Sequence, residues 1–123
     1  MPTRVLIVDD ALYMRSMIRD ILMTTGRFEI VGEASNGKEA VERFAELKPE
    51  LVTMDIVMPE LDGIEATREI LTRTPEAIIV MCSALGQEAL VIESIAAGAK
   101  DFIVKPFTPD KVLKVIDNVL KPR

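Results

Sequence analysis

Five short apolar segments recur along the chain at nearly regular intervals, and polar-apolar periodicity fills the segments between them. The apolar segments begin at Val5, Phe28, Leu51, Ala77 and Asp101, and β-branched and aliphatic residues dominate each of them. Short runs that are apolar throughout are typical of strands buried on both faces. The pattern therefore predicts five strands of a parallel sheet.

The first three intervening segments predict amphipathic helices. The first has an apolar stripe at i, i+3, i+4, i+7 and i+8 spacing, made of Met14, Met17, Ile18, Ile21 and Leu22. The second follows Asn36-Gly37 and closes at Pro49, and its inward face consists of Ala40, Val41, Phe44 and Leu47. The third begins at Asp62, a good N-cap with Glu65 three residues later, and turns inward Ile64, Thr67, Ile70 and Leu71.

The last two intervening segments also predict helices. One runs from Gly86 to about Ala97 and ends at Gly98, as a helix with a glycine C-cap does. The other starts with Thr108 as N-cap and Pro109 at the first helical position, and its apolar side chains are Leu113, Ile116 and Leu120. Strict alternation predicts an α/β fold, (βα)₅, with right-handed crossovers and helices on both faces of the sheet. A chain of this length, residues 1–123, suits one domain.

Polar side chains stand where four of the five predicted strands end. Asp9-Asp10 follow the first strand, Asp55 the third, Ser83 the fourth and Lys105 the fifth. In open parallel sheets, functional groups collect at the carboxyl ends of the strands, beside the point where strand order reverses. If the first and third strands are neighbours there, the three acids share one crevice, which the serine and the lysine flank.

Three carboxylates in one crevice repel one another, and a divalent cation relieves that repulsion. Oxygen ligands without His or Cys select a hard ion, so we expect Mg²⁺, with Mn²⁺ as a substitute. Lys105 adds a point charge that can hold a phosphoryl oxygen. The crevice is thus suited to phosphoryl transfer.

Composition excludes several other classes of function. Apolar residues make up 49% and charged residues 28% of the chain, as in a globular protein, and no run is long enough for a membrane span or a signal peptide. The net charge of −5 argues against nucleic acid as a partner. With no His, the chain cannot donate phosphate from a phosphohistidine. The single cysteine, Cys82, is interpreted as a small buried hydrophobe. Because no membrane span or signal peptide is evident, we expect a cytoplasmic protein.

Each candidate residue also has a purely structural interpretation. A lone Asp after a strand is more often a helix N-cap, Ser83 can cap the fourth helix, and Lys105-Pro106 can form an ordinary turn. Phe102 and Cys82 read as core residues on the sequence alone. Independent caps, however, have no reason to supply three acids, a hydroxyl and a lysine to one crevice. The joint pattern favours a functional site.

The segments VLIVDD, MDIVMPELDG, CSA and AKDFIVKPF resemble, in order and spacing, the signatures of bacterial two-component response-regulator receivers. The resemblance runs nearly end to end, and it is strongest to chemotaxis regulators from outside the enteric bacteria. It implies a flavodoxin-like, doubly wound sheet of order 2-1-3-4-5, an order that is taken from the family and not from the residues.

The resemblance also implies a role for each site residue. Asp55 is the phosphoacceptor, Asp10 a direct carboxylate ligand to Mg²⁺, and Asp9 a second acid that acts largely through metal-bound water. Val57 contributes its backbone carbonyl to the metal. The phosphoryl group is bound at Ser83, Ala84 and Lys105, the aromatic side chain that changes rotamer is Phe102, and the expected cis peptide is Lys105-Pro106.

Partners and kinetics follow from the same resemblance. A sensor histidine kinase is the phosphodonor, a flagellar motor-switch protein the target, a dedicated phosphatase a further partner, and the chain acts as a monomer. The readout surface is the fourth helix, fifth strand and fifth helix. Phe102 lacks the hydroxyl of the frequent Tyr, and Val57 and Leu85, which flank the path of attacking water, are apolar. We therefore expect slow self-dephosphorylation.

Three rival interpretations are open. A haloacid-dehalogenase-type phosphatase needs a second acid two residues after its nucleophile, where this chain has Val57. A flavodoxin-like electron carrier needs a first loop rich in Ser, Thr and Gly, whereas this loop is Asp9-Asp10-Ala11. A receiver can also belong to another pathway, such as a transcriptional regulator or stress or sporulation signalling; the end at Lys121-Pro122-Arg123, just past the fifth helix, favours a stand-alone domain.

Overall fold

The computed structural model describes residues 2–121, which form five strands and five helices in strict alternation. The strands are β1 Thr3–Val8, β2 Phe28–Ala34, β3 Leu51–Asp55, β4 Ile78–Ser83 and β5 Asp101–Val104. The helices are α1 Leu12–Met23, α2 Gly37–Leu47, α3 Gly63–Arg73, α4 Glu88–Ala96 and α5 Pro109–Leu120. The predicted α/β fold is confirmed.

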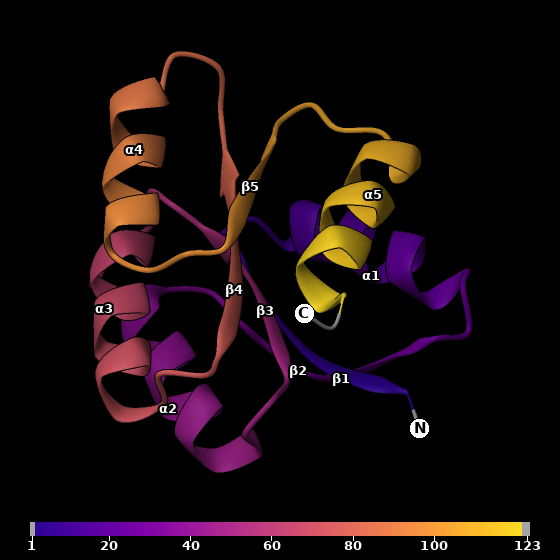
Figure 1. Cartoon of the computed structure of the whole chain (residues 1–123), viewed down its shortest axis with the longest axis horizontal. Coiled ribbons are helices and arrows are strands. Elements are labelled where there is room, and N and C mark those ends of the chain that lie inside the picture. Colours follow the sequence, from indigo (N-terminus) through magenta and orange to yellow (C-terminus); the bar gives the residue numbers. More distant parts are fainter. Residues whose placement is uncertain (1, 122–123) are drawn as a thin grey trace.

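The five strands form one parallel sheet of order β2-β1-β3-β4-β5, as the resemblance implied. Helices α2, α3 and α4 cover one face of the sheet, and α1 and α5 cover the other (Figure 1). Each face has its own apolar core, with Val52 and Met54 of β3 on one side and Leu51 on the other. Strand order reverses between β1 and β3, which places the switch point there. Within residues 2–121, no helix is long and apolar enough to cross a membrane.

Only the three central strands are buried on both faces. Their residues are almost all inaccessible, whereas β2 and β5 have mostly half-buried positions. The prediction that all five strands are buried on both sides is therefore wrong for these two. The reason is topological: β2 and β5 are the edges of the sheet, where one flank lacks a neighbouring strand.

The predicted helix starts at Asp62 and Thr108 are confirmed by their capping bonds. The side chain of Asp62 accepts from the Glu65 amide at 2.9 Å, and Thr108 accepts from the Lys111 amide at 3.4 Å, with Pro109 following in the first turn. These bonds satisfy amides that a helix start leaves unpaired. Two helices, α3 and α5, thus begin where the sequence predicts.

Two details of the predicted helices are wrong. Met17 was expected in the buried stripe of α1, but its side chain is 41% exposed, because it lies at the margin of the stripe formed by Met14, Ile18, Ile21 and Leu22. Helix α4 was expected from Gly86 and begins at Glu88. Gly86 has a left-handed φ of +88°, which a right-handed helix cannot include.

Candidate functional site

Three acids meet at the carboxyl ends of β1 and β3. Asp9 follows β1, Asp55 ends β3, and the two strands pair directly up to Val8 and Met54. One carboxylate oxygen from each of Asp9, Asp10 and Asp55 lies within 4.8 Å of the others. The predicted convergence of these residues at the switch point is therefore confirmed.

Lys105 reaches the same place from the end of β5. Its Nζ donates to Asp9 Oδ2 and to Asp55 Oδ1, both at 3.1 Å, although β4 separates β5 from β3 in the sheet. Its backbone amide donates to the Ser83 carbonyl at 2.7 Å, and its peptide bond with Pro106 is cis. The lysine and the acids thus form one cluster.

Burial shapes the electrostatics of the cluster. It raises the pKa of Asp55 to about 6, helped by the negative charge of Asp9 and opposed by Lys105. Burial pulls the pKa of Lys105 down, but the carboxylates of Asp55 and Asp9 outweigh it, so that pKa lies above its ordinary value. At neutral pH the lysine is charged and Asp55 is mostly ionised.

The charges and donors of the cluster fit a divalent hard cation. With the acids ionised, three carboxylates and one ammonium leave two negative charges, which one Mg²⁺ would neutralise. All the donors are oxygens, the ligand type that Mg²⁺ prefers. Asp10 is exposed and forms no side-chain bond within residues 2–121, whereas the buried Asp9 gives Oδ1 to the Ala11 amide and Oδ2 to Lys105. Asp10 is therefore the acid best able to turn toward an ion.

Ser83 ends β4, one residue beyond Cys82, which is the register partner of Asp55. Its hydroxyl is buried and has no hydrogen-bond partner in the described part of the chain. The interpretation of Ser83 as a cap of α4 is wrong, because the N-cap of that helix is Gln87. The neighbouring Ala84 amide is already occupied: it donates to Gln87 Oε1 at 2.7 Å. A buried, unsatisfied hydroxyl at the end of the strand next to β3, which Asp55 ends, is an open position for an acceptor.

An apolar groove of about 480 Å³ lies on the surface next to Ser83. It is lined by residues of the β4–α4 loop, α4 and β5, among them Leu85, Val91, Ile92, Ile95, Phe102 and Val104. Phe102 is 36% exposed, so its interpretation as a core residue is wrong; β5 is an edge strand and this side chain faces the groove. The structure thus joins the predicted switch aromatic to the loop that carries Ser83.

Val57 and Leu85 stand beside the site on exposed loops. Their side chains are 55% and 77% exposed, and neither has a polar group. Cys82, by contrast, is buried as predicted, and burial raises the pKa of its thiol to about 12. A thiol that stays protonated is not a nucleophile at neutral pH. Asp55 is therefore the better nucleophile of the cluster.

Two glycines whose positional role the sequence did not reveal hold the loop between β3 and α3 in place. The Gly63 amide donates to the Ile56 carbonyl at 2.7 Å, and a Cβ at Gly63 would lie 2.0 Å from the Asp55 carbonyl oxygen. The Gly37 amide donates to the Leu61 carbonyl at 2.8 Å, and a Cβ there would lie 2.0 Å from that oxygen. Only glycine permits such close backbone approach. The pairs Asp62-Gly63 and Asn36-Gly37 are evident in the sequence, but there they indicate only where two helices start.

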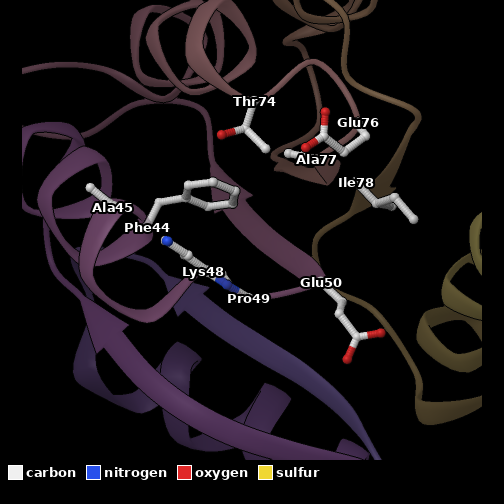
Figure 2. A pocket seen from close by; sticks show the side chains of 9 residues that line it. All are labelled: Phe44, Ala45, Lys48, Pro49, Glu50, Thr74, Glu76, Ala77 and Ile78. Atoms are coloured by element: carbon white, nitrogen blue, oxygen red, sulfur yellow. The ribbon is translucent and has the colours of Figure 1, made fainter.

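A hollow of about 700 Å³, more voluminous than the groove beside Ser83, is not at this cluster. It lies at the amino ends of β3 and β4, where the ring of Phe44 projects between Lys48 and Thr74 (Figure 2). Lys48 also lines this hollow, but within residues 2–121 neither of its two acids, Glu50 and Glu76, forms an ion pair with a lysine as Asp9 and Asp55 do, and neither unsatisfied hydroxyl lies there. We therefore assign function to the carboxyl ends of the strands, where the charged groups converge.

Comparisons with known proteins agree with this geometry. The family model of the response regulator receiver domain matches residues 5–117. Chemotaxis protein CheY of Thermotoga maritima is 58% identical over 121 residues, which cover 98% of this chain and 100% of that protein. Chemotaxis protein CheY of Bacillus subtilis is 58% identical over 120 residues, covering 98% and 99% of the two chains.

Solved structures give the same family. The crystal structure of the CheX-CheY-BeF3-Mg+2 complex from Borrelia burgdorferi matches with a TM-score of 0.93 and 38% identity, covering 99% of this chain and 92% of that one. The response regulator domain of Thermotoga maritima CheB matches with a TM-score of 0.86 and 36% identity, covering 99% and 100%. With an acidic cluster, a bridging lysine and these relatives, the chain belongs to the response regulator receiver domain family.

Proposed function

We propose that this chain is a phosphorylation-activated chemotaxis response regulator, which accepts a phosphoryl group on Asp55 from a sensor histidine kinase. The observation that carries the proposal is the Asp55 carboxylate, held at 3.1 Å by Lys105 beside two further acids. Relatives named chemotaxis protein CheY, at 58% identity over nearly the full chain, favour chemotaxis over a transcriptional pathway.

In the proposed reaction a carboxylate oxygen of Asp55 attacks the phosphorus of a phosphohistidine on the kinase. The new O–P bond forms as the P–N bond breaks, and the leaving imidazole keeps the electron pair and takes up a proton from solvent. Asp55 must be ionised to attack, and a pKa of about 6 leaves it mostly so at neutral pH. Lys105 is near enough to neutralise charge on the phosphoryl oxygens.

The residues that would hold Mg²⁺ are Asp10, Asp55 and the backbone carbonyl of Val57, with Asp9 beside them. When bound, the ion supplies positive charge that offsets the charge on the phosphoryl oxygens. The Borrelia burgdorferi relative was solved with BeF3 and Mg+2, which supports the same ligand chemistry for this chain.

Phosphorylation would change the partners of Ser83 and Lys105. The Ser83 hydroxyl, which lacks a partner within residues 2–121, would donate to a phosphoryl oxygen. Lys105 would release one carboxylate and donate to a second phosphoryl oxygen instead. Moving a two-state equilibrium from 1:99 to 99:1 needs about 5.5 kcal/mol. Two hydrogen bonds to charged groups, each worth roughly 1.5 to 3 kcal/mol, supply most of it. These two bonds therefore bring the switch close to the required free energy.

The groove beside Phe102 is the proposed readout surface. Inward rotation of Phe102 would reshape a groove whose lining is mainly apolar, suited to a helix or peptide of a flagellar motor-switch protein. A dedicated phosphatase is a further proposed partner, since the Borrelia burgdorferi CheY relative was solved in a complex with CheX. We place this activity in the cytoplasm, in a monomer whose residues 1–123 act as one domain.

The direct test is labelling with acetyl phosphate in the presence of Mg²⁺. Asp55→Asn should abolish incorporation of phosphate, because the amide cannot form the acyl phosphate. Asp20→Asn, which changes an exposed acid on α1 outside the cluster, should label like the wild type. Labelling that persists in Asp55→Asn, at any other residue, would refute the assignment.

Slow self-dephosphorylation is a second proposed property. Val57 and Leu85 are exposed at the rim of the site and have no polar group to orient attacking water. A single added hydrogen bond, worth about 1 kcal/mol, corresponds to roughly a fivefold change in rate. Val57→Asn should therefore shorten the lifetime of the phosphorylated state about fivefold, measured as release of inorganic phosphate after removal of the donor. A wild-type decay that is already rapid, and unchanged in Val57→Ala and Leu85→Ala, would contradict this property.

A further inference from the structure

Arg15 is hydrogen-bonded to the backbone of the loop between β1 and α1, which contains Asp9 and Asp10. Its Nη1 donates to the Asp9 carbonyl oxygen at 2.6 Å, and its Nε donates to Glu33 Oε1 at 2.9 Å. The guanidinium is mostly buried between α1 and the end of β2. Arg15 thereby connects the loop between β1 and α1 to β2, which lies at the opposite edge of the sheet from β5 and Lys105.

The other polar groups of Asp9 are also engaged. Its amide donates to the Ala34 carbonyl at 3.1 Å, its Oδ1 accepts from the Ala11 amide at 2.9 Å, and its Oδ2 accepts from Lys105. The bond from Arg15 is made to the Asp9 carbonyl oxygen, which belongs to the peptide group between Asp9 and Asp10. Rotation of that peptide group would move the exposed carboxylate of Asp10, and the bond from Arg15 opposes such a rotation.

Within residues 2–121, Glu33 has two arginine partners, and one of them also bonds to the loop. Arg15 contacts both Glu33 and the Asp9 carbonyl, whereas Arg19, among the described residues, pairs with Glu33 alone. The two arginines bring the same charge to nearly the same place. They therefore allow the effect of position to be separated from the effect of charge.

We infer that Arg15 is a positioning residue for the divalent-cation site, and that it acts through the backbone of Asp9 and with the support of Glu33. The inference rests on the proposed function, since it presumes that the acidic cluster binds Mg²⁺. A planar guanidinium can donate to the carbonyl and to the carboxylate at once, in a geometry that a lysine ammonium does not reproduce. Groups that orient metal ligands typically change metal affinity by about 10- to 100-fold when removed.

The experiment measures Mg²⁺ affinity by competition with Mn²⁺, followed by the electron paramagnetic resonance signal of free Mn²⁺. Proteins are first shown to be folded by circular dichroism. Arg15→Ala and Arg15→Lys should each weaken Mg²⁺ binding about tenfold, and Arg19→Ala should stay within about twofold of the wild type. If Arg15→Ala does not fold, Glu33→Gln takes its place and should weaken binding about threefold, because an amide oxygen supports the guanidinium less well.

A second readout needs no metal. In the metal-free protein, hydrogen exchange of the Ala11 amide should become roughly tenfold faster in Arg15→Ala and should not change in Arg19→Ala, because the loop that holds this amide opens more often. Wild-type affinity and exchange retained in both Arg15 variants, while the wild type binds Mg²⁺, would overturn the inference alone. Equal losses in Arg15→Ala and Arg19→Ala would also overturn it, in favour of a charge effect. A wild type that fails to bind Mg²⁺ would instead overturn the proposed function.

Discussion

At the residue scale, the protein buries two hydroxyls that have no partner within residues 2–121, and they differ in their surroundings. Ser83 ends β4, the strand next to β3, and under the proposed function a phosphoryl oxygen on Asp55 would satisfy its Oγ. Thr53 Oγ1 lies deeper in β3, two residues before Asp55, and its register partners Ile7 and Val80 are apolar. An unsatisfied buried hydroxyl costs about 1–3 kcal/mol. The cost at Ser83 has a functional explanation, whereas nothing in the structure explains the one at Thr53.

Thr53→Val should therefore stabilise the protein. The substitution keeps the β-branched shape and removes the unsatisfied hydroxyl, so we expect the free energy of unfolding to rise by about 1 kcal/mol. Urea denaturation followed by circular dichroism measures this change. Ser83→Ala, the matched control, removes the other hydroxyl but should also impair stable phosphorylation, whereas Thr53→Val should label normally. A Thr53→Val protein less stable than the wild type would show that the hydroxyl has a partner.

At the element scale, the loop between β4 and α4 is held by a contact that phosphorylation would have to break. The Ala84 amide donates to Gln87 Oε1 at 2.7 Å, so the side chain at the N-cap of α4 reaches back over the loop. Under the proposed function, Ala84 binds the phosphoryl group. Gln87 and a phosphoryl oxygen therefore compete for the same donor.

Gln87→Ala should consequently favour the phosphoryl-bound loop. Loss of one competing hydrogen bond, worth about 0.5–1.5 kcal/mol net, should tighten binding of beryllofluoride by roughly two- to tenfold. Isothermal titration calorimetry in saturating Mg²⁺ gives the affinity. Gln87→Glu, which keeps an acceptor and adds negative charge, should shift the affinity in the opposite direction. Equal affinities for the two variants would exclude this competition.

At the scale of the whole molecule, the buried acid that the proposed function needs lowers the stability of the metal-free protein at neutral pH. Burial and Asp9 raise the pKa of Asp55 to about 6, so the folded state binds this proton more tightly than the unfolded chain does. The stabilisation from a raised carboxyl pKa is fully present below the unfolded pKa, near 4, and is lost as pH rises through the folded pKa. Without metal, the group therefore destabilises the protein at neutral pH.

Asp55→Asn should remove this pH dependence. In metal-free buffer, the stability of Asp55→Asn relative to the wild type should grow by on the order of 1–3 kcal/mol between pH 4 and pH 7.5. Urea denaturation at several pH values in EDTA measures the difference. Added Mg²⁺ should stabilise the wild type at pH 7.5 and have less effect on the variant, since ligand binding to the folded state adds stability. A stability difference that is constant across this pH range would contradict the assigned shift.

Much of the fold was predictable from local signals. Apolar runs identified the five strands, and caps such as Asp62 and Thr108-Pro109 marked two helix starts, because both depend on residues close together in sequence. The errors concern features set by distant neighbours. Met17 is exposed at the margin of its helix stripe, and Phe102 is exposed because β5 lies at an edge of the sheet.

The residue types of the candidate site were likewise evident from sequence. Asp9, Asp10, Asp55, Ser83 and Lys105 all follow or end predicted strands, and parallel strands bring such residues to one edge of a sheet. Their motifs also carried the family resemblance that the comparisons support. The sequence by itself thus determined which chemistry is present, because the strand ends and the acids are local features.

Only the tertiary structure decided how these groups are held. Three contacts join different elements. Lys105 bridges Asp9 and Asp55, Gly63 lies against the Asp55 backbone, and Arg15 donates to the Asp9 carbonyl. Such contacts depend on strand order, register and side-chain rotamer, which local patterns do not specify. The sequence names the acids of the switch, and packing between elements fixes where each acid points.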